Sequence, residues 1–352
     1  MSFESIVNAL GQEADSLLRH ECRLLPKSTT IQPSLYHVEN IFRGSDRSEK
    51  TILNLHRLYG SGNLADTGYL SIFPVDQGVE HTAGFSFTKN PIYFDPLKIV
   101  ELAVEAGCSG VASTLGVLGL AAKQYASKIP FILKINHNEL LTYPEKHDEI
   151  LFAQVHQAVQ LGAAGVGATI YFGSKESGRQ ITEISKVFAE AHAAGLFTIL
   201  WCYPRNSAFQ RPNGSVETAA DLTGQANHLG VTIQADIIKQ KLPTLARGFS
   251  ALNYSKYSDE MYDRLIGDHP IDWVRYQVAN CYNGRISLIN SGGEFGGESD
   301  VQTAIRTAVI NKRGGGSGLI MGRKVFNRSF QDGVSLIKAV QEVYLEPQIT
   351  IA

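Results

Sequence analysis

Residues 130–135 read PFILKI, residues 164–170 read AGVGATI and residues 196–201 read LFTILW, three apolar runs separated by helical patterns. Such runs indicate strands buried on both faces, which is typical of parallel sheets covered by crossover helices. Five similar runs complete the set: Tyr69–Val75, Gly110–Ser113, Ala235–Lys239, Ile286–Asn290 and Gly318–Met321. Eight strand–helix units suit closure into a ring, so the sequence predicts an α/β fold of the (β/α)8 TIM-barrel type.

The alternative fold is an open, doubly wound sheet. It is disfavoured because no strand is followed by a G-x-G-x-x-G turn. Residues 1–68 lack the strand–helix alternation and contain an amphipathic helical stretch, Phe3–Leu18, and a second helical candidate, Ile52–Leu58. We therefore expect an N-terminal helical extension over residues 1–68, packed on the barrel or at a subunit interface, and a catalytic barrel over residues 69–352.

The composition is that of an ordinary globular protein. Its formal net charge of -2 gives no reason to expect nucleic acid or an anionic membrane as a partner. No apolar run approaches the roughly 18 residues of a membrane span, and the N-terminus lacks a signal-peptide pattern. The cysteines, Cys22, Cys108, Cys202 and Cys281, are scattered without a C-x-x-C pair, which indicates reduced thiols and neither disulfides nor a zinc site. A cytoplasmic enzyme is expected.

Polar side chains follow the predicted strands at their carboxyl ends, where barrel enzymes build their active sites. The candidates there are Asp76, His81, Lys134, Trp201, Tyr203 and Lys239. Each also has an ordinary structural interpretation, such as a loop cap, a rim aromatic or an ion pair between Lys134 and Asp76. Their convergence on one cavity is what favours a functional site.

Lys239 is the most informative of these residues because it ends the apolar strand Ala235–Lys239. Strand alternation places its side chain on the same face as Ile237, toward the barrel interior. Desolvation there lowers the amine pKa and makes the nitrogen a nucleophile toward a carbonyl carbon. A shift from about 10.4 to near 7 corresponds to roughly 4–5 kcal/mol. Lys241 has the same parity and remains the alternative.

Two glycine segments, Ser291-Gly292-Gly293 and Gly322-Arg323, follow the last two strands, where barrels often bind phosphate. Glycines let backbone N–H groups approach an anion, and Arg323 supplies a forked donor. A reactive lysine beside a phosphate site indicates Schiff-base carbon–carbon chemistry on a phosphorylated ketose. Tyr203 is then the candidate proton shuttle, and Asp76 and Lys134 would orient substrate hydroxyls.

Several segments around all the strands carry a resemblance to a known family. They are Pro74–His81, Lys134–His137, Trp201–Arg205, Ala235–Lys239, Ser291–Gly293 and Gly322-Arg323. Over nearly its whole length the chain resembles the archaeal-type class I fructose-bisphosphate aldolases and their bacterial counterparts. The resemblance implies a lyase that reversibly cleaves fructose 1,6-bisphosphate to dihydroxyacetone phosphate and glyceraldehyde 3-phosphate, with no metal or other cofactor.

The resemblance also implies roles for individual residues. Lys239 matches the Schiff-base lysine, Tyr203 the proton-transfer tyrosine and Asp76 the acid after the first strand. The residues that it implies in substrate binding are Trp201, Lys134 and the phosphate group Ser291, Gly292, Gly293, Gly322 and Arg323. The resemblance does not fix the partners of the second phosphate, for which His81 is a separate suggestion. Members of the family form large homo-oligomers, which is implied here too.

Three other functions remain open. A related Schiff-base barrel could carry out aldol or thiolytic chemistry on another phosphorylated ketone. A metal-dependent aldolase could use His81, His137 and His228 as ligands, although nothing in the sequence fixes their geometry. A phosphosugar-binding regulator without catalysis would leave Lys239 unexplained.

Overall fold

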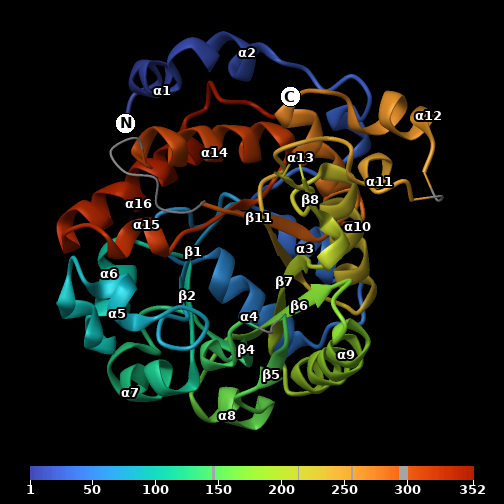
Figure 1. The fold of residues 1–352 in the computed structure, drawn as a ribbon. Coiled ribbons are helices and arrows are strands. Elements are labelled where there is room, and N and C mark those ends of the chain that lie inside the picture. The colour runs from blue at the N-terminus through green and yellow to red at the C-terminus, as the bar shows by residue number, and fades with distance from the viewer. Residues whose placement is uncertain (145–146, 213, 255–256, 293–299) are drawn as a thin grey trace.

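A computed structural model of the chain describes residues 1–144, 147–212, 214–254, 257–292 and 300–352. In this described part, eight parallel strands close into a barrel in the order β1-β12-β11-β10-β7-β6-β3-β2 (Figure 1). The strands are β1 (Leu70–Val75), β2 (Gly110–Ser113), β3 (Phe131–Lys134), β6 (Gly165–Phe172), β7 (Phe197–Pro204), β10 (Ile237–Gln240), β11 (Ser287–Ser291) and β12 (Gly318–Ile320). The predicted (β/α)8 barrel is therefore confirmed.

The barrel interior is filled by branched aliphatic side chains. They are Leu70, Ile72, Ile132, Ile199, Ile237, Ile289 and Ile320. Glycines on β6 make room for aromatic rings of β7: a Cβ on Gly165 would lie 2.4 Å from the Phe197 ring, and one on Gly167 would lie 2.7 Å from Trp201. Close packing tolerates no such overlap, so the absence of a side chain on β6 lets Trp201 lie inside the barrel.

Helices surround the strands on the outside (Figure 1). The main crossover helices are α6 (Pro96–Glu105), α7 (Leu115–Tyr125), α8 (Val155–Gln160), α9 (Ser177–Ala193), α10 (Ala220–Thr232), α13 (Pro270–Ala279), α14 (Asp300–Gly314) and α16 (Phe330–Leu345). Shorter helices are α5 (Ala83–Phe87), α11 (Gly248–Ala251), α12 (Asp259–Met261) and α15 (Arg323–Phe326). Two hairpins interrupt the alternation, β4 (Asn136–Asn138) with β5 (Glu149–Leu151), and β8 (Gln210–Arg211) with β9 (Gly214–Ser215).

The segment before the barrel forms α1 (Phe3–Leu10), α2 (Ala14–Arg19), α3 (His37–Phe42) and α4 (Glu49–Tyr59). Ile52, Leu55 and Leu58 of α4 pack against the interior side chains of the barrel, and the helix lies in the middle of the strand ring in Figure 1. The Tyr59 hydroxyl hydrogen-bonds that of Ser287, the first residue of β11, at 2.6 Å. Helix α4 covers the amino ends of the strands, so the barrel is open at their carboxyl ends.

Helices α1 and α2 lie outside the barrel beside α14 (Figure 1). Arg306 of α14 forms two hydrogen bonds of 2.8 Å to the carboxylate of Glu13, which joins α1 to α2. Among the described helices, none combines the length and the apolarity needed to cross a bilayer.

Candidate active site

The carboxyl ends of the strands surround one cavity. Its lining residues are Pro74, Asp76, Gln77, Glu80, His81, Tyr171, Trp201, Tyr203, Arg205, Lys239, Lys241, Ser291, Gly292, Ile320, Gly322 and Arg323. The structure therefore brings together the predicted site residues Asp76, His81, Trp201, Tyr203, Lys239, Ser291, Gly292, Gly322 and Arg323. Lys134 is not part of this lining but is buried beside Trp201 and Glu80. Gly293 lies outside the described residues.

Lys239 lies in β10 between Trp201 of β7 and Ile289 of β11. It is 7% exposed, and its amine donates a hydrogen bond to the Tyr203 hydroxyl. Burial lowers the pKa of Lys239 well below its usual value, and the positive charge of Arg323 adds to this effect while Asp76 opposes it. At neutral pH this amine therefore holds its lone pair far more often than an exposed lysine does.

Lys241 lines the same cavity but follows the end of β10 and is only half-buried. Desolvation is the largest cause of a lowered amine pKa, and it acts most strongly on a fully buried group. Lys239 therefore has the better environment for a nucleophile. Its assignment as the Schiff-base lysine stays a prediction.

Tyr203 belongs to a stack of groups on one wall of the cavity. Its ring stacks on that of Tyr171 with centroids 6.2 Å apart, and the Arg205 guanidinium lies 5.3 Å from the Tyr203 ring centroid. Glu217 accepts a hydrogen bond of 3.0 Å from Arg205 and fixes it there. Arg205 had no role in the sequence-based prediction, yet the parity of residues 201, 203 and 205 could have indicated it.

Lys134 makes an ion pair, but its partner is Glu80 and not Asp76. The Lys134 amine donates to Glu80 at 2.8 Å and to the Asn136 carbonyl at 2.9 Å. A second carboxylate, that of Glu149, lies 4.0 Å away. Burial alone would lower the pKa of Lys134, but Glu80, Glu149 and Asp76 together raise it above its usual value. Lys134 is therefore charged at neutral pH.

Two carboxyl groups share this one cation, and they differ in protonation. Burial opposes ionisation of Glu80, but Lys134 and His137 hold the pKa of Glu80 well below its usual range. Burial raises the pKa of the Glu149 carboxyl to about 8, and the charge of Glu80 adds to the rise. At neutral pH, Glu80 is thus the charged partner and Glu149 carries a proton. Sequence reasoning gave neither residue a role.

The loops after β11 and β12 pack tightly at the mouth of the barrel. The Gly292 N–H donates to the Ile320 carbonyl at 3.0 Å, so this donor is used within the barrel. A Cβ on Gly292 would lie 2.3 Å from the Met321 side chain, and one on Gly322 would lie 2.5 Å from the Pro74 carbonyl oxygen. Both glycines are therefore required for packing. A phosphate role for Ser291, Gly292, Gly322 and Arg323 stays a prediction supported by their place in the cavity.

The three histidines of the metal-dependent alternative do not share a site. His81 lines the cavity, His137 lies 3.2 Å from a Glu80 oxygen, and His228 of α10 packs edge-on against the ring of Tyr282. Among the described residues, the one group of three His, Cys, Asp or Glu side chains with metal-ligand spacing includes none of these histidines. The geometry gives no support to that alternative.

Comparisons with known proteins point in one direction. Residues 70–328 match the DeoC/LacD family of aldolases. A Chlamydia muridarum protein named "Probable fructose-bisphosphate aldolase class 1" is 53% identical over 348 residues, covering 99% of each chain. The class 1 fructose-bisphosphate aldolase of Thermoproteus tenax is 32% identical over 186 residues, or 53% of this chain and 67% of that one.

Solved structures agree with the sequence comparisons. An archaeal fructose-1,6-bisphosphate aldolase, solved with its catalytic lysine covalently bound to the carbinolamine intermediate of the substrate, superimposes with a TM-score of 0.62 at 25% identity. The similarity covers 78% of this chain and 93% of that one. A protein of Slackia heliotrinireducens superimposes with a TM-score of 0.68 at 22% identity, which covers 84% and 86% of the two chains and supports the shared fold.

Proposed function

The chain belongs to the DeoC/LacD family of aldolases, and we propose that it is a class I fructose-bisphosphate aldolase with Lys239 as its Schiff-base residue. It cleaves fructose 1,6-bisphosphate reversibly to dihydroxyacetone phosphate and glyceraldehyde 3-phosphate. The observation that supports this most directly is a buried amine with a lowered pKa, in contact with a phenol, in the cavity at the carboxyl end of the barrel.

The first step needs a neutral amine. The Lys239 nitrogen attacks the ketone carbon to form a carbinolamine, and loss of water gives an iminium ion. Burial and the nearby charge of Arg323 favour the neutral amine before the attack. The same positive Arg323 would attract the phosphate group adjacent to the ketone, so one side chain serves both binding and activation.

Bond cleavage follows from the iminium. The substrate hydroxyl on the carbon beyond the breaking bond loses its proton, the bond electrons move to the iminium, and glyceraldehyde 3-phosphate leaves an enamine behind. Protonation of the enamine carbon and addition of water then release dihydroxyacetone phosphate and regenerate the amine. Tyr203 touches the Lys239 nitrogen and can give and take the protons at this position.

The remaining site residues surround the substrate in this proposal. Asp76 would orient a hydroxyl and balance the iminium charge, since its charge already acts on Lys239. Trp201 forms a wall of the cavity, with the Lys134 amine 5.6 Å from its ring centroid. His81 is proposed for the second phosphate, and Ser291 and Gly322 for the first. The enzyme is also proposed to act in the cytoplasm, in glycolysis and gluconeogenesis, as a large homo-oligomer.

Borohydride trapping tests the reaction class and the residue together. Reduction in the presence of dihydroxyacetone phosphate should fix a covalent adduct on the peptide that contains Lys239, as identified by mass spectrometry. An adduct on Lys241 would reassign the nucleophile, and no adduct on either lysine would end the Schiff-base proposal. Turnover of fructose 1,6-bisphosphate against other phosphorylated ketoses then distinguishes the proposed substrate from that of a related Schiff-base aldolase.

A further inference from the structure

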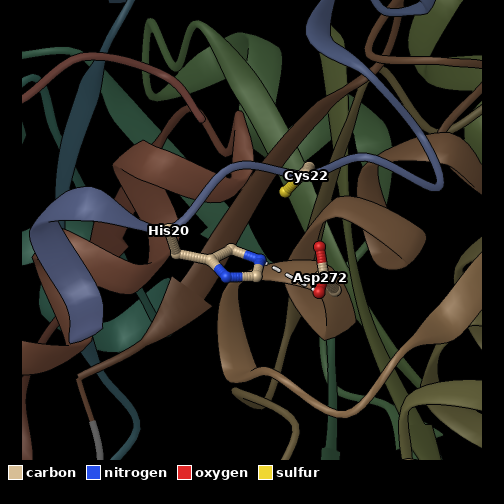
Figure 2. Close-up of side chains that lie close together, drawn as sticks. All are labelled: His20, Cys22 and Asp272. Carbon is tan, nitrogen blue, oxygen red and sulfur yellow. Dashed lines mark ion pairs between the residues drawn. The ribbon is translucent and has the colours of Figure 1, made fainter.

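Three side chains with metal-binding atoms meet outside the barrel, away from the cavity described above. They are His20 and Cys22, in the segment after α2, and Asp272, in the first turn of α13 (Figure 2). One ligand atom from each lies within 4.8 Å of the others. None of the three residues lines the active-site cavity. The group joins the N-terminal segment to a crossover helix about 250 positions later in the chain.

We propose that His20, Cys22 and Asp272 form a binding site for a divalent transition-metal ion, with zinc as the best fit. Imidazole nitrogen, thiolate sulfur and carboxylate oxygen are the three ligand types that zinc takes in proteins. A hard cation such as magnesium or calcium prefers oxygen ligands alone, so the thiol and the imidazole argue against it.

The relation between His20 and Asp272 supports a shared ion. The Nε2 atom of His20 is buried and faces an Asp272 oxygen 3.0 Å away as an ion pair, drawn as the dashed line in Figure 2, but the contact lacks hydrogen-bond geometry. Two ligands on a tetrahedral zinc, each about 2.0–2.2 Å from the ion, lie roughly 3.3–3.6 Å apart. The observed pair is slightly closer than that spacing, so a small separation of the two side chains would let one ion bind both atoms in place of their direct contact.

The ligand-bearing segment is held in place by two buried arginines. Arg313 donates to the backbone carbonyls of Leu18 and His20, and Arg275 donates to that of Leu25 at 2.6 Å. The His20 ring also stacks on that of His269, with centroids 3.7 Å apart and planes 12° apart. A site whose ligands are ordered before the ion arrives loses little entropy when it binds.

Burial and neighbouring charges determine whether Cys22 is protonated before a metal ion binds. Burial raises the pKa of Cys22 to about 12, and the charge and hydrogen bond of Asp272 add to the rise, while the positive charges of Arg275 and Arg313 act in the opposite direction. A bound zinc would displace the thiol proton, and the thiolate and the Asp272 carboxylate would together neutralise the dication. Both guanidinium groups are already engaged by backbone carbonyls, so they remain in place as the ion enters.

The fourth coordination position would hold water. The side chains of His20 and Asp272 are 22% and 12% exposed, and they border a surface hollow that also includes Arg19, Glu21, Arg23 and Leu24. Solvent can therefore reach the ion from that side, while Cys22 anchors it from the buried side. The bound ion would therefore link the segment after α2 to α13 and stabilise their contact.

Cobalt(II) is the probe for this site because a thiolate ligand gives it a charge-transfer band in the near ultraviolet. Full-length protein freed of metal with a chelator should bind one cobalt per chain with that band, and zinc should displace the cobalt. Cys22→Ser should lose the band, whereas the matched control Cys108→Ser, which changes another buried cysteine outside the group, should keep it. Zinc should raise the unfolding midpoint of the wild type but not that of Cys22→Ser.

Two results would overturn the proposal. One is a wild-type protein that gives no thiolate band with cobalt, and the other is a Cys22→Ser protein that keeps it. If Cys22→Ser fails to fold, X-ray absorption of the zinc-loaded wild type decides instead: one sulfur neighbour at about 2.3 Å is expected, and a shell of nitrogen and oxygen alone refutes the site. Borohydride trapping on Lys239 is independent of all these outcomes.

Discussion

Two lysines at strand ends of the same barrel have opposite pKa shifts. Lys134 at the end of β3 is 3% exposed and Lys239 in β10 is 7% exposed, so both amines are removed from water. Despite its burial, the pKa of Lys134 is raised by its acidic neighbours, above all by the charged Glu80. The pKa of Lys239 is lowered by burial and by the charge of Arg323.

The comparison shows that burial does not by itself make a lysine reactive. A buried amine beside two carboxyl groups stays charged and acts as a structural cation. A buried amine whose hydrogen-bond partner is a phenol, with another cation nearby, has a lowered pKa and is more often neutral, as the proposed nucleophile must be. Substitutions around Lys134 and around Lys239 should therefore give different results, and each of the following experiments tests that difference.

The largest effect is expected from Lys239→Met. Without the amine no Schiff base can form, so turnover of fructose 1,6-bisphosphate should fall by roughly 10⁴-fold or more, the scale of loss that removal of a covalent nucleophile causes. A coupled assay of glyceraldehyde 3-phosphate release measures it. Lys241→Met is the matched control because it removes a second amine from the same cavity while leaving Lys239 intact. The assignment is wrong if the control is the inactive variant.

The free energy of unfolding should also distinguish the two lysines, but here the larger effect is expected at Lys134. Lys134→Met leaves Glu80 buried without its cation, and breaking a buried pair in this way typically costs about 3–5 kcal/mol of unfolding free energy. Lys239→Met removes an amine that burial already disfavours, so the unfolding free energy should be unchanged or increased. Urea denaturation at pH 7 measures both variants. Equal losses would mean that Lys239 also has a strong stabilising partner.

The next effect concerns the phenol beside the reactive amine. Tyr203→Phe keeps the ring but removes the hydroxyl that accepts from Lys239, so kcat should fall by about 10²–10³-fold with little change in KM. Exchange of a dihydroxyacetone phosphate proton with solvent should slow in parallel. Tyr171→Phe is the control, since that ring stacks on Tyr203. A normal exchange rate in Tyr203→Phe would move the proton-transfer role to another group, with Asp76 the next candidate.

The sequence predicted the barrel because each strand is a short, fully buried run between helical patterns. The observed strands begin within two residues of the predicted positions; the expected Ala235–Lys239, for example, is Ile237–Gln240 in the structure. Residues at strand ends, such as Tyr203 and Lys239, were predictable for the same reason. Closure of a parallel barrel brings all carboxyl ends together, so position along the strand alone places them.

Residues that come from loops and hairpins could not be predicted from their position along a strand. Glu149 comes from the hairpin of β4 and β5, which folds back after β3 and leaves no periodic signal in the sequence. Glu80 lies in the loop after β1, where backbone direction and not strand parity decides which way the side chain points. The structural interpretation of Lys134 therefore offered Asp76, a strand-end acid, as an ion-pair partner, whereas the structure pairs Lys134 with Glu80.

The smallest expected effect concerns Glu149, the second carboxyl group beside Lys134 at the end of β3. Burial raises the pKa of Glu149 to about 8, from an ordinary value of 4.5 in the unfolded chain. Because the folded state holds the proton more tightly, this carboxyl group stabilises the fold fully below pH 4.5. That contribution is lost as the pH rises to about 8. Lys134 limits the loss because its charge favours the ionised form.

Glu149→Gln cannot ionise, so it should match the neutral carboxyl at low pH and avoid the penalty at high pH. We expect equal stability for variant and wild type below about pH 4.5, and an advantage for the variant that grows to a few kcal/mol by about pH 9. Urea denaturation across that range measures it, and turnover at pH 7 should be nearly unchanged. A stability difference that did not vary with pH would mean that Glu149 is already ionised beside Lys134, and that two carboxylates share the cation at the end of β3.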